Sequence, residues 1–321
     1  MKTSVVVPVY NEEGNLPELL RRLGGVMDDT GEPYELVFVD DGSRDGSLAI
    51  LKAAAAARPD RVRVLELARN FGQHQAILAA FESVSGDVVV TLDADLQNPP
   101  EEIPKLLEKV REGYDVVGGV RLDRQDSFLR RLASALVNRV TVVITRMRIT
   151  DFGCMLRAYA RDVVEEINRC DESSTFIPAL AQSFARRPTE IVVAHAPRRH
   201  GTSHYSLYRL IRLNFDLMTG FSLVPLQVFG LLGTLVAFGG IGFGLFLFIR
   251  RLVHGAEVEG VFTLFAILFT LLGIAMAGLG LVGEYVGRIY QQVRGRPRFR
   301  VRRVYGLGAD ARPGESGAGR R

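Results

Sequence analysis

Two long segments without a charged residue, Val224–Ile249 and Val261–Gly283, restrict the fold of this chain more than any other feature. Each is longer than the roughly 20 apolar residues that a helix needs to cross a bilayer. Buried core helices are the alternative, but uncharged runs of this length are unusual in soluble domains. Only residues 250–260 connect the two segments. The sequence therefore predicts a transmembrane hairpin whose two ends lie on the same side of the membrane.

Arginine is distributed unequally around this hairpin. The connection contains Arg250 and Arg251, whereas the flanks contain Arg209, Arg212, Arg288, Arg294, Arg296, Arg298, Arg300, Arg302 and Arg303. Because short flanking segments rich in Lys and Arg stay in the cytoplasm, this asymmetry outweighs the two arginines of the connection. The N-terminus also lacks the apolar stretch and cleavage site of a signal peptide. We expect a multi-pass membrane protein with both termini in the cytoplasm.

The first 121 residues alternate short β-branched runs with helical patterns, of which 49–57 and 103–111 are examples. The expected strands are Ser4–Val9, Glu35–Asp40, Val62–Leu67, Asp87–Leu92 and Asp115–Val120. This alternation is typical of an α/β fold with a mainly parallel sheet covered by helices. Such a sheet binds its ligands at the carboxyl ends of the strands.

Composition divides the chain into four predicted parts. These are an α/β domain over 1–203, a juxtamembrane amphipathic helix over 204–223, two spans over 224–283 and a basic cytoplasmic tail over 284–321. A second basic amphipathic segment, about 128–149, is expected to lie among lipid headgroups. An ordinary core-facing helix with a basic solvent face is the alternative for both amphipathic segments.

Two aspartates, Asp93 and Asp95, follow the fourth expected strand, and Gln97 comes shortly after them. Two carboxylates at this spacing can hold a divalent cation such as Mg²⁺ or Mn²⁺ and leave coordination sites for a diphosphate. A solvent-exposed acidic turn is the simpler alternative. The pattern predicts a metal site made by Asp93, Asp95 and Gln97.

Asp40 and Asp41 end another expected strand, where a carboxylate can accept hydrogen bonds from a base or from ribose hydroxyls. A turn that uses the following glycine is the alternative. The sequence contains neither a GxGxxG nor a GxxxxGK[ST] motif, which disfavours a dinucleotide cofactor and a P-loop. Its two cysteines, Cys154 and Cys170, form no CxxC or Cys/His cluster, which disfavours a zinc site.

These motifs, taken in order, carry a resemblance. The runs 5–13, 39–43 and 92–97, which read VVVPVYNEE, VDDGS and LDADLQ, resemble the inverting GT-A glycosyltransferases of family 2, in particular the dolichol-phosphate-mannose-synthase-like branch. The resemblance implies a Rossmann-like GT-A domain and assigns nucleotide-sugar binding to Pro8, Tyr10, Asn11, Glu12, Asp40, Asp41, Arg69 and Asp93. It assigns the metal and diphosphate to Asp93, Asp95 and Gln97, with Asp95 and Asp151 as catalytic residues.

Further runs resemble the bacterial undecaprenyl-phosphate 4-deoxy-4-formamido-L-arabinose transferases of lipid A modification. They are 69–74 (RNFGQH), 151–159 (DFGCMLRAY), 174–178 (STFIP) and 283–290 (GEYVGRIY). The implied partners are a UDP-sugar, undecaprenyl phosphate and the lipids of the inner membrane. At 201–205 the chain reads GTSHY where that pattern has GESKY, so Thr202 and His204 leave glucose and other sugars open.

A lipid monophosphate is the implied acceptor. Its second pKa of about 6 makes it largely a dianion at neutral pH, so a strong general base is less necessary than for a sugar hydroxyl. A positive cradle is needed instead, and its candidates are Arg121, Arg124, Arg130, Arg131 and Ser134. Arginines that only contact lipid headgroups are the alternative. Asp151 is either a base or a residue that orients the cradle or the sugar.

Rival functions fit the sequence less well. A processive polysaccharide synthase of the same family marks its acceptor site with Gln-x-x-Arg-Trp, and this chain has no tryptophan. A nucleotide-sensing membrane scaffold is the non-enzyme alternative, and divalent-metal-dependent sugar transfer would distinguish it from an enzyme. No nucleic-acid partner is expected, and the sequence leaves the oligomeric state open, a homo-oligomer included.

Overall fold

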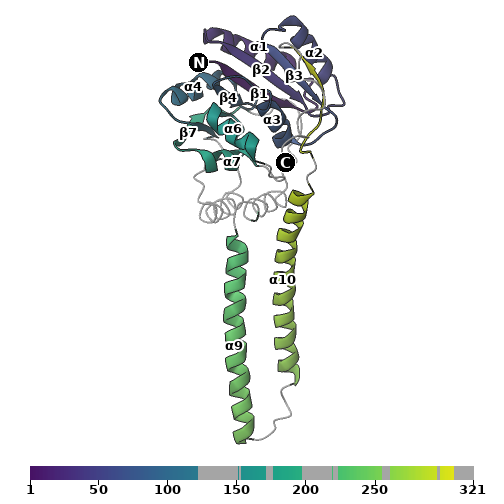
Figure 1. Cartoon of the computed structure of the whole chain (residues 1–321), viewed down its shortest axis with the longest axis vertical. Helices are drawn as coiled ribbons and strands as arrows, with labels where there is room; N and C mark the ends of the chain where they lie inside the picture. Colours follow the sequence, from purple (N-terminus) through teal and green to yellow (C-terminus); the bar gives the residue numbers. More distant parts are fainter. Residues whose placement is uncertain are drawn as a thin grey trace. The chain divides into compact units, whose positions relative to one another are not determined.

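The computed structural model describes residues 1–121, 151, 153–170, 176–196, 219, 223–254, 261–294 and 297–306. They belong to two compact units (Figure 1). One unit contains the N-terminal part of the chain together with the residues after 295, and the other contains the two long helices. The predicted amphipathic segment 128–149 lies outside the described residues, as does the segment 204–223 apart from residues 219 and 223.

The first unit is built on an eight-stranded sheet with the order β7-β5-β6-β4-β1-β2-β3-β8. All neighbouring pairs are parallel except those made by β6 and β8. The strands are β1 (Thr3–Val9), β2 (Tyr34–Asp40), β3 (Val62–Leu67), β4 (Val88–Thr91), β5 (Val116–Arg121), β6 (Arg157–Ala160), β7 (Pro188–Val193) and β8 (Val301–Tyr305). This arrangement confirms the predicted α/β fold with a mainly parallel sheet.

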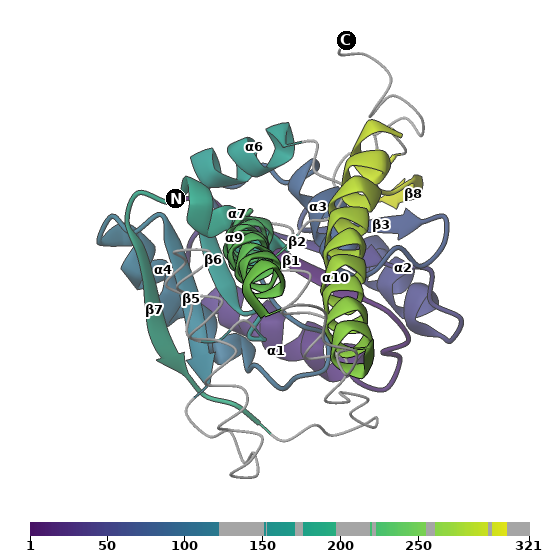
Figure 2. The same cartoon turned by 90° about the horizontal axis from the view of Figure 1, so that it is seen from below.

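Helices cover both faces of this sheet (Figure 2). On one face lie α1 (Leu16–Asp29), α2 (Ser47–Ala57), the short 3₁₀ helix η1 (Pro100–Glu102) and α4 (Ile103–Arg111). The other face carries α3 (Gln73–Phe81), α6 (Arg161–Arg169) and α7 (Ile177–Phe184). Alternate strand residues point to opposite faces, so Val5, Val7 and Val9 join the core beneath α1. The burial of these apolar side chains holds the layers together.

The sheet places the carboxyl ends of its parallel strands at one edge. Strand β1 lies between β2 and β4. From β1 the strand order continues to β2 and β3 on one side and to β4, β6 and β5 on the other. Val9 pairs with Asp40, and Val6 pairs with Thr91, which brings the turns after these three strands together. A strand order that reverses at this point creates the crevice where α/β sheets bind ligands.

Strand β8 comes from the segment that was predicted to be a tail. It pairs antiparallel with β3, and its Tyr305 hydroxyl donates a hydrogen bond of 2.7 Å to the buried Glu66 carboxylate. Arg302 forms an ion pair of 3.2 Å with the same carboxylate. Residues before and after the long helices therefore share one sheet. Because strands cannot pair through a bilayer, both flanks lie on the same side of any membrane that the helices cross.

The second unit contains α9 (Val224–His254) and α10 (Val261–Val293), which extend beyond the predicted apolar segments at their C-terminal ends. Both helices are long and apolar enough to cross a membrane. Large apolar side chains such as Leu231 and Phe238 are exposed along them. Apolar surface of this extent is unstable in water and requires a lipid or protein partner. The two helices contact each other, and Phe229 packs close to Gly278.

The hairpin predicts which positions a membrane-impermeant maleimide can reach. In a Cys170→Ala background, where Cys154 is buried, Glu257→Cys in the connection should be labelled in spheroplasts. Arg303→Cys, an exposed position of β8, should be labelled only after lysis. Labelling in the reverse sense would overturn the expected orientation, and labelling of both in spheroplasts would contradict the hairpin itself.

Candidate active site

The turn after β4 carries the predicted metal ligands. Asp95 is 8% exposed, and its Oδ1 accepts a hydrogen bond of 3.1 Å from the Gln97 backbone amide. Leu96 between them has φ +60°, a left-handed conformation that costs a non-glycine residue energy and often marks a functional site. This turn fixes the Asp95 carboxylate close to the backbone of Gln97.

The electrostatics of this turn fit a bound cation. Burial raises the pKa of Asp93 to about 7, and repulsion from Asp95 contributes to the shift. A divalent ion between two neighbouring carboxylates would offset this repulsion. In the part of the chain that the structure describes, no group of three His, Cys, Asp or Glu side chains could hold a metal.

The turns after β1 and β2 are cross-linked by hydrogen bonds. Asn11 has φ +55°, donates its backbone amide to Ser43 Oγ at 3.1 Å and accepts from the Arg44 amide at 2.8 Å. The Glu12 amide donates to Ser47 Oγ at 2.8 Å. Asp40 is almost completely buried, and burial raises its pKa. The two turns thus form one rigid polar surface at the strand ends.

The turn after β3 is attached to this surface by Asp41. Its carboxylate accepts hydrogen bonds from the backbone amides of Phe71 at 2.7 Å and Gly72 at 2.9 Å. The Arg69 guanidinium lies over the Phe71 ring, 4.3 Å from its centroid, and the Arg69 side chain is exposed. An exposed guanidinium beside the crevice is available for an anionic ligand.

At the end of β5, Arg121 forms a bidentate ion pair with Asp151. The Nε–Oδ2 and Nη2–Oδ1 distances are 2.7 and 2.9 Å, and the side chains are 18% and 5% exposed. The Gly153 amide donates to Asp151 as well, at 3.0 Å. Both carboxylate oxygens of Asp151 therefore accept hydrogen bonds. Arg121 in turn lies within electrostatic range of Asp93.

A buried arginine supports the loop that contains Asp151. Arg157 is 1% exposed and donates to the carbonyl oxygens of Asp151 at 2.6 Å and Cys154 at 2.9 Å. Gly118 of the adjacent strand makes room for it, because a Cβ there would lie 2.9 Å from Arg157 Nη1. A buried charge is tolerated only when its donors are satisfied in this way.

The structure brings most of the predicted site residues to one edge of the sheet. Those at the strand ends or in the turns that follow are Pro8, Tyr10, Asn11, Glu12, Asp40, Asp41, Arg69, Asp93, Asp95, Gln97 and Arg121, and Asp151 joins them through its ion pair. The candidate acceptor residues Arg124, Arg130, Arg131 and Ser134 lie outside the described residues. The catalytic and binding roles of the whole set stay predictions.

Sequence reasoning missed residues that the structure places at the same edge. Gln73 contacts Asp93, and Arg157 supports Asp151. His195 follows β7 and interacts electrostatically with Arg121, Asp95 and Asp151, while burial lowers its pKa. The available signal for Gln73 and His195 was their position in the segments that follow β3 and β7. Nothing in the sequence marked Arg157 as buried.

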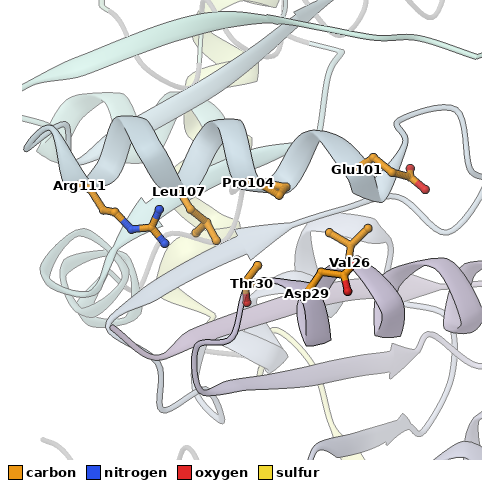
Figure 3. Close-up of a pocket in the computed structure, with 7 residues that line it drawn as sticks. All are labelled: Val26, Asp29, Thr30, Glu101, Pro104, Leu107 and Arg111. Atoms are coloured by element: carbon orange, nitrogen blue, oxygen red, sulfur yellow. The ribbon is translucent and has the colours of Figure 1, made fainter.

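A separate hollow of about 320 Å³ lies between α1 and α4 (Figure 3). Its lining comprises Val26, Asp29, Thr30, Glu101, Pro104, Leu107 and Arg111. None of the predicted site residues is among them. Glu101 forms an ion pair with Arg22, and Arg111 forms one with Glu32.

Comparison with known proteins identifies the family. Residues 4–168, which contain the strand-end motifs, match the model described as glycosyl transferase family 2. The chain belongs to this family. It is therefore a glycosyltransferase, and the resemblance seen in the sequence is confirmed.

Relatives of this family 2 glycosyltransferase cover nearly the whole chain. An undecaprenyl-phosphate 4-deoxy-4-formamido-L-arabinose transferase of Shewanella sediminis is 54% identical over 94% of this chain and 92% of that protein. The enzyme of the same name from Aeromonas hydrophila is 50% identical over 94% and 93%. Among solved structures, glucosyl-3-phosphoglycerate synthase from Mycobacterium tuberculosis with Mn²⁺, UDP and phosphoglyceric acid is 20% identical, covers 68% of this chain and 76% of that chain, and has a TM-score of 0.47.

The Arg121–Asp151 pair predicts coupled effects on stability. Arg121→Gln or Asp151→Asn should each cost about 3 kcal/mol, because each leaves a buried charge without its partner. The double variant should lose less than the sum. Thermal unfolding in detergent can be followed with a thiol-reactive dye that detects buried Cys154 in a Cys170→Ala background.

Arg21→Gln serves as the control, because Arg21 pairs with Glu18 on the surface and should unfold close to the wild-type temperature. Losses that add in the double variant would show that Arg121 and Asp151 stabilise the fold independently.

Proposed function

We propose that this glycosyltransferase transfers 4-deoxy-4-formamido-L-arabinose from its UDP derivative to undecaprenyl phosphate, with inversion at the anomeric carbon. The reaction takes place at the cytoplasmic face of the inner membrane and serves lipid A modification. The names of relatives that share half or more of their residues over 94% of the chain support the substrates. The observation that carries the chemistry is the carboxylate pair Asp93 and Asp95 in the turn after β4, oriented by hydrogen bonds from Gln73 and from the Gln97 amide.

Asp93, Asp95 and Gln97 would hold a divalent cation, which would supply positive charge to the departing UDP diphosphate. The arrangement of the chain's own groups prepares for this. The Gln97 amide holds the Asp95 carboxylate in one orientation, and Arg121 adds a fixed positive charge close to Asp93. Charges fixed before the reaction stabilise the transition state without reorganisation at the moment of transfer.

The nucleotide is bound by the turns after β1, β2 and β3. Asp40 lies at the end of β2 and is suited to accept hydrogen bonds from the base, while Tyr10 is exposed beside it for contact with the uridine. Asn11 and Glu12 keep the first turn in shape through their bonds to Ser43 and Ser47. Pro8 restricts the strand end, and exposed Arg69 is suited to a phosphate.

The acceptor phosphate needs positioning more than deprotonation. It is already largely a dianion at neutral pH, so its oxygen can attack the anomeric carbon without a strong base. Asp151 then acts by holding Arg121, as its bidentate pairing indicates. Arg124, Arg130, Arg131 and Ser134 complete the cradle in this proposal, with separate residues serving the two substrates.

The sugar is tested directly by mass spectrometry. Purified protein is incubated with undecaprenyl phosphate, Mg²⁺ or Mn²⁺, and UDP-4-deoxy-4-formamido-L-arabinose, UDP-glucose or UDP-N-acetylglucosamine in parallel. A lipid product with the mass of the formamido-arabinose adduct supports the proposal. Preferential transfer of glucose would overturn the proposed sugar, and absence of any lipid product would overturn the proposed acceptor.

Asp95→Ala should abolish transfer and leave the fold intact, because it removes a metal ligand from a turn at the sheet edge. Initial rates of lipid product formation measure the effect, and excess EDTA should reproduce it in the wild-type protein. Asp29→Ala on α1 removes a carboxylate at the hollow of Figure 3 and is the matched control. Full activity of Asp95→Ala would exclude this site for the metal.

Arg130→Ala should raise the KM for undecaprenyl phosphate or lower kcat, while the affinity for UDP-sugar stays close to wild type. An arginine fork can bind two phosphate oxygens, so Arg130→Lys should restore activity only in part. Steady-state kinetics with each substrate varied in turn separates the two effects. Weaker UDP-sugar binding would place Arg130 in the donor site, and a change in membrane association alone would favour contact with headgroups.

A further inference from the structure

Gln73, the first residue of α3, contacts the first aspartate of the metal motif. Its side-chain amide Nε2 donates a hydrogen bond of 2.6 Å to Asp93 Oδ1. This oxygen is therefore directed toward α3. Asp93 Oδ2 is the atom left for a cation or a ribose hydroxyl. Neither the family assignment nor the strand-end pattern gives Gln73 a role.

The backbone on both sides of Gln73 is held in place. Gly72 before it has φ +97°, which only glycine adopts readily. His74 after it is half-buried, with its ring edge against Phe176 at a centroid distance of 5.0 Å, and desolvation lowers its pKa to about 4. The exposed Gln73 side chain thus leaves the backbone from a fixed point and reaches Asp93.

The position of this backbone depends on Asp41. Its two carboxylate oxygens accept hydrogen bonds from Phe71 and Gly72, the two residues before Gln73. The loop also packs on Gly42, where a Cβ would lie 2.7 Å from the Arg69 carbonyl carbon and the Asn70 nitrogen. At 3% exposure, Asp41 uses both of its oxygens within the protein.

We propose that Asp41 and Gln73 are positioning residues for Asp93: Asp41 fixes the loop 69–72, and Gln73 at its end holds the Asp93 carboxylate in its metal-binding orientation. This assignment rests on the proposed metal site, and it gives Asp41 a different role from the nucleotide contact that the family resemblance implies. The physical need is the repulsion between Asp93 and Asp95. A hydrogen-bond donor fixed on one oxygen of Asp93 opposes rotation of this carboxylate away from Asp95.

Gln73→Leu removes the donor and keeps a similar volume. The affinity for Mn²⁺ in the presence of saturating UDP should fall about 10-fold, as expected when a hydrogen-bond partner of a metal ligand is lost. Electron paramagnetic resonance of free Mn²⁺ measures this without any turnover. The affinity for UDP in EDTA, measured by calorimetry, should not change. Gln182→Leu, the same substitution at a half-buried position of α7, is the matched control and should bind Mn²⁺ like the wild type.

Asp41→Asn tests the second step. It places an amide group against the two backbone amides, so the loop loses a hydrogen-bond acceptor and no longer holds the backbone of Gln73 in place. Mn²⁺ affinity should fall as in Gln73→Leu, and the double variant should bind Mn²⁺ no more weakly than the weaker single variant. UDP affinity in EDTA should stay at the wild-type value, which also shows that the nucleotide site is folded.

The outcomes distinguish a failure of the proposed metal site from a failure of the positioning roles of Gln73 and Asp41. If the wild type binds no Mn²⁺ with UDP present, the proposed metal site is wrong. If the wild type binds and Gln73→Leu binds equally well, the positioning role of Gln73 is overturned. A loss of UDP affinity in EDTA for Asp41→Asn would return Asp41 to direct nucleotide contact, and additive losses of Mn²⁺ affinity in the double variant would show that the two residues act separately.

Discussion

The repulsion between two carboxylates at the end of β4 is the constraint around which the rest of the site is organised. Asp93 and Asp95 are separated by a single residue, and burial raises the pKa of Asp93 to about 7. Each carboxylate is restrained by a donor of its own, Gln73 for Asp93 and the Gln97 backbone for Asp95. Two carboxylates held this close repel each other, and a bound cation would remove that repulsion. The pair is therefore suited to bind a metal together with a diphosphate.

Sheet topology supplies the positive side of this site. Strand β6 enters antiparallel between β4 and β5, so the loop before β6 starts at the same edge at which β4 and β5 end. Asp151 in that loop can then pair with Arg121 at the end of β5. Arg157 fills the space that Gly118 leaves and holds the loop from below. Charge and packing therefore act together, because Gly118 leaves room for the buried Arg157, and Arg157 supports the loop that pairs with Arg121.

Strand β8 completes the sheet of the first unit, although its residues follow the two long helices in the chain. Strand β8 follows α10 and completes the sheet beside β3, with Ala68 donating its amide to the Arg300 carbonyl at 2.9 Å. The next residues along the chain form the loop that Asp41 holds. Without β8, β3 would be an edge strand with unpaired backbone amides and carbonyls, and its pairing with β8 satisfies these groups. Strand β8 thus supports the strand β3, which leads directly into that loop.

The sequence alone determined what depends on local pattern. The β-branched runs predicted β1 to β5 within a residue or two of their ends, and the uncharged runs predicted both long helices. The strand-end motifs led to the family and to the candidates Asp93, Asp95 and Gln97. It did not foresee β8, because a basic segment of five residues acquires strand structure only from the edge that it covers. Nor did it foresee the roles of Gln73, Arg157 and His195 or the pairing that engages Asp151. Those depend on which strand ends become neighbours, and contacts between residues far apart in the chain are decided by the tertiary structure, since only folding brings their side chains within hydrogen-bonding distance.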